Sequence, residues 1–187
     1  MCGEDVALNF GNNREVQSMQ VESTFERARA LKYPEQIVIA IARDPAGKYN
    51  PITLGWVTQT SHEPPMFAIS IGNTRYSLGV IRAAKEFVLA WPSEHQKDET
   101  LFFGTKSGRE VDKLAEAGTP TQPARAIDGV LLRDAVANLE CRLVSELQTG
   151  DHVIFVGQVV AAHVNRRPLN RLYTVGENYQ FEGLPRR

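Results

Sequence analysis

Cysteine is nearly absent from this sequence, and there is no excess of charge of either sign. The 187 residues include only two cysteines, Cys2 and Cys141, too few for a framework of disulfides. Lysines and arginines number 21 and aspartates and glutamates 22, so the net charge of −1 gives no general attraction for nucleic acid or anionic membranes. An anionic ligand would therefore have to be held by local groups.

Long apolar runs and metal-binding patterns are also missing. No stretch approaches the roughly 20 apolar residues that a transmembrane helix needs, and the acidic, asparagine-containing N-terminus has no signal-peptide pattern. We therefore expect a cytoplasmic protein without a membrane or nucleic-acid partner. We also expect no metal site, because metal-ligand spacing is absent from the four histidines, His62, His95, His152 and His163.

Two glycine-rich nucleotide signatures are lacking as well. No Gly-x-Gly-x-x-Gly turn follows a predicted strand, so a Rossmann site for a nicotinamide dinucleotide is not expected. The stretch Gly104-Thr105-Lys106-Ser107-Gly108 resembles a P-loop in composition but not in order, which argues against a nucleoside triphosphate site. Cys141 lies in an apolar alternation and is predicted to pack in the core rather than to act as a nucleophile.

Strand-like periodicity runs through most of the chain. Strands are predicted at residues 36–43, 52–59, 66–71, 87–91, 135–148 and 153–164, with hairpin turns at 44–48 and 149–151. Helices are predicted at residues 15–32, 78–85, 94–105 and 109–117, the last between a cap at Ser107 and a stop at Gly118. A loose tail is expected at 1–13, a loop around Pro120 and Pro123, and a flap or final strand in 168–181. Together these elements predict a mainly β antiparallel barrel with helical inserts.

Residues 50–77 contain the clearest candidate for a binding site. After the strand at 66–71, the sequence Thr74-Arg75-Tyr76-Ser77 leads into the predicted helix. A helix start offers free N–H groups, and together with a hydroxyl cap and a neighbouring cation it can bind an anion. Arg75 and Ser77 are therefore candidate anion ligands, although a surface cation and an ordinary helix cap would give the same pattern.

The order of these motifs resembles the FMN-binding split-barrel family of the flavin reductase and flavoredoxin type. The resemblance is carried by Asn-x-x-Thr-x-x-Trp at 50–56, Ser-x-x-Pro-Pro at 61–65 and Arg-x-Ser at 75–77, and it continues at 86–92, 108–113, 139–142 and 150–157. It covers about residues 33–181 and implies a split β-barrel, antiparallel and Greek-key-like. Residues 1–33 would then be an N-terminal tail and helical extension, and residues 34–187 the flavin reductase-like domain.

The resemblance also implies roles for individual residues. Arg75 and Ser77 would bind the FMN phosphate, and Lys113 would lie near the phosphate or the flavin edge. His152, in the sequence Gly-Asp-His, would be the catalytic candidate, because a histidine near the flavin can orient nicotinamide or stabilise the charge of the reduced ring. The other candidate FMN-binding residues are Asn50, just before the strand predicted at 52–59, and Thr53, Gly55, Trp56, Thr58 and Ser70 on the strands predicted at 52–59 and 66–71.

Each of these residues also has an ordinary structural explanation. Asn50 precedes a proline in a turn-like context, and an aromatic residue such as Trp56 usually packs in a core. Most lysines on helices are solvated, and Lys113 has Glu110 as a partner at helical spacing. A lone histidine in a turn, such as His152, is usually exposed. The site assignment therefore depends on the resemblance.

The function that the resemblance implies is an FMN-dependent oxidoreductase. It would transfer a hydride from NADH or NADPH to flavin, and then reduce free flavin or another acceptor. The alternative is an FMN-binding electron-transfer or carrier protein without NAD(P)H reductase activity, and a third reading is a barrel that has lost its flavin. The family also implies a homodimer, in which the N-terminal helix or residues 173–181 would complete the partner's site.

Overall fold

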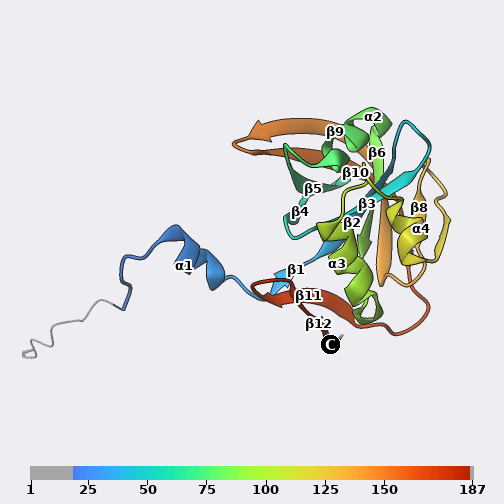
Figure 1. Ribbon diagram of the computed structural model, residues 1–187. Coiled ribbons are helices and arrows are strands. Elements are labelled where there is room, and N and C mark those ends of the chain that lie inside the picture. The colour runs from blue at the N-terminus through green and yellow to red at the C-terminus, as the bar shows by residue number, and fades with distance from the viewer. Residues whose placement is uncertain (1–18, 186–187) are drawn as a thin grey trace, which may run out of the picture. The chain divides into compact units, whose positions relative to one another are not determined.

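The computed structural model describes residues 19–185, so the tail predicted at residues 1–13 lies outside the described residues (Figure 1). The boundary between two compact units falls between Leu31 and Lys32. In the first unit, helix α1 (Phe25–Ala30) begins at Thr24, whose side chain accepts a hydrogen bond from the Arg27 backbone N–H. Within the described residues the helix predicted over 15–32 is therefore too long, and its positions 15–18 lie outside the described residues. A helix in a protein is stabilised mainly by packing of its apolar face. Because α1 buries no side chain, no such packing is present to stabilise a longer helix.

The second unit is built around a seven-stranded sheet in which every neighbouring pair is antiparallel, in the order β3-β2-β6-β9-β10-β5-β4. Ile52 from one edge and Val57 from the other belong to the same buried cluster, so the sheet curls into a barrel. This confirms the predicted fold class. The strands are β2 (Val38–Arg43), β3 (Tyr49–Leu54), β4 (Val57–His62), β5 (Pro65–Gly72), β6 (Glu86–Trp91), β9 (Ala137–Thr149) and β10 (His152–Val164).

The strand predicted at 52–59 is wrong, because the chain breaks there into β3 and β4, the two edges of the sheet. Leu54 and Val57 are both buried although they lie three residues apart, so the alternation changes phase across Gly55 and Trp56. Trp56 is left 48% exposed, and its carbonyl accepts a hydrogen bond from the Ser70 N–H. Strand alternation predicts that Trp56 lies in the core. Because the alternation changes phase, Trp56 lies at the surface instead.

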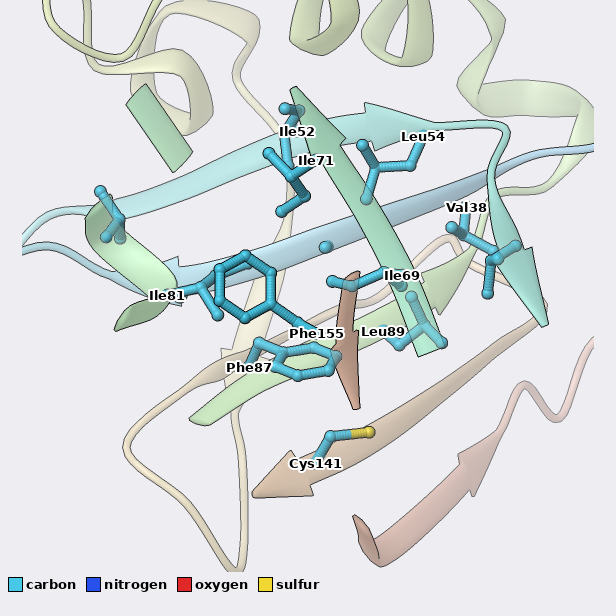
Figure 2. Packing of buried hydrophobic residues seen from close by; sticks show 14 of the residues in the cluster. Val38, Ile52, Leu54, Ile69, Ile71, Ile81, Phe87, Leu89, Cys141 and Phe155 are labelled. Carbon is cyan, nitrogen blue, oxygen red and sulfur yellow. The ribbon is translucent and has the colours of Figure 1, made fainter. Parts of the chain in front are cut away.

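The interior of the barrel is apolar and tightly packed (Figure 2). Phe87, Leu89 and Phe155 are almost completely buried there, and Cys141 packs among them as predicted. Burial raises the pKa of the Cys141 thiol to about 12, so the thiolate needed for nucleophilic chemistry is disfavoured.

A second core lies on the outer face of β2 and β6. Ile39, Ile41 and Val88 pack there against Phe103 of α3 and Leu131 of β8. Figure 1 shows α3, α4 and β8 together on this side of the barrel. The elements outside the barrel are β1 (Glu35–Gln36), α2 (Tyr76–Ala84), η1 (Glu94–Gln96), α3 (Lys97–Thr105), α4 (Lys113–Ala117), β7 (Thr121–Pro123), β8 (Val130–Leu132), β11 (Arg171–Gly176) and β12 (Gln180–Leu184).

Several predicted boundaries around these elements need correction. Helix α2 begins after Arg75 and has no side-chain cap, so the predicted hydroxyl cap is wrong. Helix α4 is capped by Asp112 rather than Ser107, although it ends at Gly118 as predicted. The loop expected at Pro120 and Pro123 contains the short strand β7, and the C-terminal segment forms the hairpin β11–β12. None of the helices within residues 19–185 is long and apolar enough to span a membrane.

Candidate functional site

Asn50 and Ser77 form a buried polar pair where β3 meets the first turn of α2. Asn50 Nδ2 donates a hydrogen bond to Ser77 Oγ at 2.7 Å, and both residues are buried. Asn50 Oδ1 is also buried but has no hydrogen-bond partner among the described residues. An unsatisfied buried acceptor costs about 1–3 kcal/mol, so this oxygen is suited to a donor group on a ligand.

Gly108 makes the position of the Asn50 side chain possible. A Cβ atom at residue 108 would lie 2.9 Å from Asn50 Cγ, 3.0 Å from Tyr76 Cδ1, and well inside contact distance of Asn50 Oδ1. Only glycine fits at this close approach between the loop after α3 and the start of β3.

Lys113, the first residue of α4, is a buried cation that has no acidic partner within residues 19–185. Its side chain is 3% exposed, and Nζ donates a hydrogen bond to the Phe103 carbonyl at 3.0 Å. No carboxylate among the described residues forms an ion pair with it. Burial, and in second place repulsion from Arg75, lower the pKa of Lys113 from 10.5 to about 8. A buried ammonium that lacks a carboxylate is suited to an anionic ligand.

Ser77, Gly108 and Lys113 line a cavity of 240 Å³ between α2 and the loop from α3 to α4. Asn50 adjoins this lining through its contacts with Ser77 and Gly108. Arg75, Lys106, Arg109 and Lys113 contribute positive charge, against one carboxylate, Glu110. The free N–H groups at the start of α2 add to the positive potential. The cavity therefore has the electrostatic character and hydrogen-bond donors of an anion site.

Two further candidates, Trp56 and His152, lie next to this cavity on the side of Gly72, the last residue of β5. A Cβ placed at Gly72 would lie 3.5 Å from His152 Nε2 and 3.7 Å from Arg75 Cγ. The ring of His152 packs on Trp56, with centroids 4.6 Å apart and an angle of 40° between the planes. His152 Nδ1 lies 2.6 Å from Asp151 Oδ1, so an exposed carboxylate orients the imidazole.

The remaining predicted site residues do not line the cavity. The Thr53 hydroxyl donates to the Thr100 carbonyl at 2.6 Å, so it is engaged with α3. Gly55 faces the Glu35 carboxylate, and Thr58 is exposed on the edge strand β4. Ser70 lies beside Trp56 through its backbone hydrogen bond. The structure thus brings together Arg75, Ser77 and Lys113 around the cavity, with Asn50 hydrogen-bonded to Ser77 outside the lining. Trp56 and His152 lie next to this group.

Sequence reasoning missed several groups that line or shape the site, namely Lys106, Gly108, Arg109 and the Phe103 carbonyl. Lys106 and Gly108 belong to the stretch that resembles a P-loop in composition, and Phe103 and Arg109 flank it. That composition was the available signal, because glycine and cations in a loop suit an anion site whatever the order of the motif. Within the described part of the chain, no three potential metal ligands of the His, Cys, Asp or Glu type lie together.

Comparison with known proteins identifies the family. The sequence model of the flavin reductase like domain matches residues 30–182. An uncharacterised protein of Archaeoglobus fulgidus is 33% identical over 134 residues, which cover 72% of this chain and 75% of that protein. The NADH-dependent FMN reductase AsuE2 of Streptomyces nodosus subsp. asukaensis is 28% identical over 156 residues, which cover 82% of this chain and 80% of that enzyme.

A solved structure shows the same fold. The FMN-binding protein of Thermus thermophilus with bound p-hydroxybenzaldehyde superposes with a TM-score of 0.74 and 27% identity, covering 90% of this chain and 94% of that one. The chain therefore belongs to the flavin reductase like domain family, and its barrel is the split barrel of that family.

Proposed function

We propose that this protein is an FMN-dependent oxidoreductase of the flavin reductase type. The observation that carries the proposal is the cavity lined by the buried Lys113 together with Arg75 and Ser77. Asn50 donates a hydrogen bond to the Ser77 hydroxyl from outside the lining. The likeness to an NADH-dependent FMN reductase supports the same conclusion. Bound FMN would supply the redox chemistry, by accepting a hydride from NADH or NADPH and passing two electrons to free flavin or another acceptor.

The residues of the cavity fit the phosphate end of FMN. Arg75, Arg109 and Lys113 would neutralise the phosphate, which is costly to bury unless it is paired and hydrogen-bonded. Ser77 Oγ accepts from Asn50, so its own hydrogen is free to donate to a phosphate oxygen. Asn50 Oδ1 needs a donor, which a phosphate dianion lacks, so we assign it to a hydroxyl group of the ribityl chain.

Trp56 and His152 would flank the flavin ring, and His152 is our candidate catalytic residue. Its contact with Asp151 fixes the orientation of the imidazole, with Nε2 on the side of Gly72. A protonated imidazole there would stabilise negative charge that develops on the reduced ring. Thr53, Gly55 and Thr58 have no assigned contact with FMN in this proposal.

The test is a visible absorption spectrum of protein saturated with FMN and desalted, followed by anaerobic addition of NADH and, separately, NADPH. We expect the desalted protein to retain FMN, and one of the two nucleotides to bleach the visible absorption of that FMN. The variant His152→Gln should retain FMN and bleach more slowly, because only the hydride-transfer step uses the imidazole.

Other outcomes would contradict parts of the proposal. Retained flavin that neither nucleotide bleaches would replace the reductase with an electron-transfer or carrier protein. If no flavin is retained by the wild-type protein, the site assignment itself is wrong.

The lowered pKa of Lys113 predicts a pH dependence of FMN binding. The phosphate favours the ammonium form, so above about pH 8 binding must be accompanied by proton uptake. The dissociation constant for FMN should therefore rise above about pH 8, by at most about tenfold per pH unit. Fluorescence titrations with FMN between about pH 7 and 9.5 measure this, and a Lys113→Met control should lose the dependence.

In the FMN-free protein, Lys113 is expected to make the free energy of unfolding rise with pH, whereas FMN affinity falls with pH. The pKa is lower in the folded protein than in the unfolded chain, so between about 8 and 10.5 the unfolded chain binds more protons at Lys113. Protonation at lower pH favours the unfolded chain, and the contribution of Lys113 to the free energy of unfolding rises with pH over this window. Urea unfolding of FMN-free wild-type and Lys113→Met protein would separate this contribution from that of other groups.

We further propose a homodimer in the cytoplasm, with residues 1–33 as an extension that reaches the partner and residues 34–187 as the flavin-binding domain. Half-exposed apolar residues on the β9–β10 hairpin, such as Val144 and Leu147, are compatible with a subunit contact. Sedimentation analysis of the full chain tests this, since a monomer at micromolar concentration would contradict it.

A further inference from the structure

A second cavity, of 680 Å³, lies between the segment that follows β8 and the end of β10. It shares no lining residue with the cavity that contains Lys113. Four groups that carry or can acquire positive charge line it: Arg133, His163, Arg166 and Arg167. In a chain with a net charge of −1, this is a local concentration of cations.

Two of these cations have no counter-charge within residues 19–185. Arg167 pairs with Asp134, the one carboxylate in the lining. The exposed guanidinium groups of Arg133 and Arg166 form neither an ion pair nor a side-chain hydrogen bond with any described residue. Arginine forks match phosphate and carboxylate groups in geometry as well as in charge.

His163 is held at the wall of the cavity by a buried acid. The Glu140 carboxylate is fully buried and accepts hydrogen bonds from the backbone N–H groups of Arg125, at 2.8 Å, and Ala126, at 2.5 Å. The backbone N–H groups and His163 lower the pKa of Glu140 against the opposing effect of burial. His163 Nε2 lies 2.6 Å from Glu140 Oε1, so this nitrogen is engaged and Nδ1 is the ring nitrogen left for another partner.

The floor of the cavity is also fixed by hydrogen bonds. Asn138 exchanges two of them with the backbone of Leu132. Asn165 Nδ2 donates to the carbonyls of Arg133 and Ala135. The backbone that carries Arg133 is thereby tied to the segment that carries Arg166, so the two free guanidinium groups are displayed from a preorganised surface.

We propose that this cavity is a second binding site, for a small ligand that carries two or more phosphate or carboxylate groups. Arg133 and Arg166 bind the anionic groups, and His163 Nδ1 offers a further hydrogen-bonding atom. The site is separate from the proposed flavin site, and its existence does not depend on the activity of that site.

Calorimetric titration of the FMN-saturated protein with inorganic pyrophosphate, and separately with citrate, tests the proposal. FMN occupies the first cationic cavity in this experiment; if the protein does not hold FMN, the Arg75→Gln variant removes a cation from that cavity instead. We expect saturable binding of at least one probe, weakened at least tenfold in the double variant Arg133→Gln/Arg166→Gln. Binding of pyrophosphate alone assigns a phosphate ligand, and binding of citrate alone assigns a carboxylate ligand.

The matched control is Arg27→Gln/Arg29→Gln on α1, which removes the same charge from exposed positions of the first unit. It should bind both probes like the wild-type protein. Equal weakening in both double variants would show only a general charge effect and would overturn the proposal, as would the absence of saturable binding. Thermal unfolding confirms that each variant is folded, and the single variant Arg166→Gln provides the same comparison should the double variant fail to fold.

Discussion

Replacing Lys113 with methionine is expected to raise the dissociation constant for FMN by about 10- to 150-fold, while leaving the FMN-free fold as stable as before or more stable. Charge-assisted hydrogen bonds contribute about 1.5–3 kcal/mol, and the buried ammonium forms no ion pair with a carboxylate among the described residues. In the FMN-free protein the same burial disfavours the charge, as the lowered pKa shows. A lysine whose role is to stabilise the fold would lower the free energy of unfolding when it is replaced. Loss of FMN affinity without loss of stability would therefore indicate a ligand-binding role for Lys113.

Fluorescence titration with FMN and urea unfolding of the FMN-free protein measure the two halves of this prediction. Lys97→Met is the matched control, because Lys97 is an exposed lysine of α3 outside the cavity lining. It should leave both quantities unchanged. Normal FMN affinity in a folded Lys113→Met variant would show that Lys113 is a structural lysine and would remove it from the site.

Replacing Gly108 with alanine should abolish retention of FMN on desalting and lower the free energy of unfolding by about 1–3 kcal/mol. The added methyl group would overlap Asn50 Oδ1 and lie 3.0 Å from Tyr76 Cδ1, so the Asn50 amide must move and its hydrogen bond to Ser77 breaks. One methyl group thus disturbs the polar centre of the site without removing any ligand.

The double variant Asn50→Ala/Gly108→Ala separates the two consequences. With the Asn50 amide removed, the methyl group at 108 has room on that side, so it should cost less stability than it does in the wild-type background. FMN retention should stay lost, because Asn50 is itself a proposed ligand. An equal loss of stability in both backgrounds would show that the overlap with Asn50 is not the cause.

Gly79→Ala is the control for substituting glycine as such. Gly79 lies within α2, and a Cβ there would meet no atom within 4 Å. This variant should retain FMN and be as stable as the wild type, or more stable by up to about 1 kcal/mol from helix propensity.

Sequence periodicity predicted the barrel because most of its strands are long enough to show their pattern. The long hairpin of β9 and β10 and the apolar strand β2 follow directly from alternation and from continuous burial. Gly150, with φ of +51°, marks the hairpin turn as the sequence indicates. The break between β3 and β4 could not be predicted in this way, because closure of the barrel, rather than any local signal, puts Leu54 and Val57 on the same core.

For the candidate site, too, some features follow from the sequence and others only from the tertiary structure. The family resemblance in the sequence nominated Asn50, Arg75, Ser77, Lys113 and His152 as site residues, and these assignments stay predictions. The sequence by itself determined the antiparallel barrel and the charge balance that makes any anion site a local one. Only the tertiary structure decided that Lys113 is buried with no acidic partner among the residues that the structure describes, and that the loop containing Gly108 closes over Asn50. It alone also gathered Arg133 and Arg166 at a second cavity. These facts depend on contacts between segments far apart in the chain, and the spacing of residues along a sequence carries no direct record of such contacts.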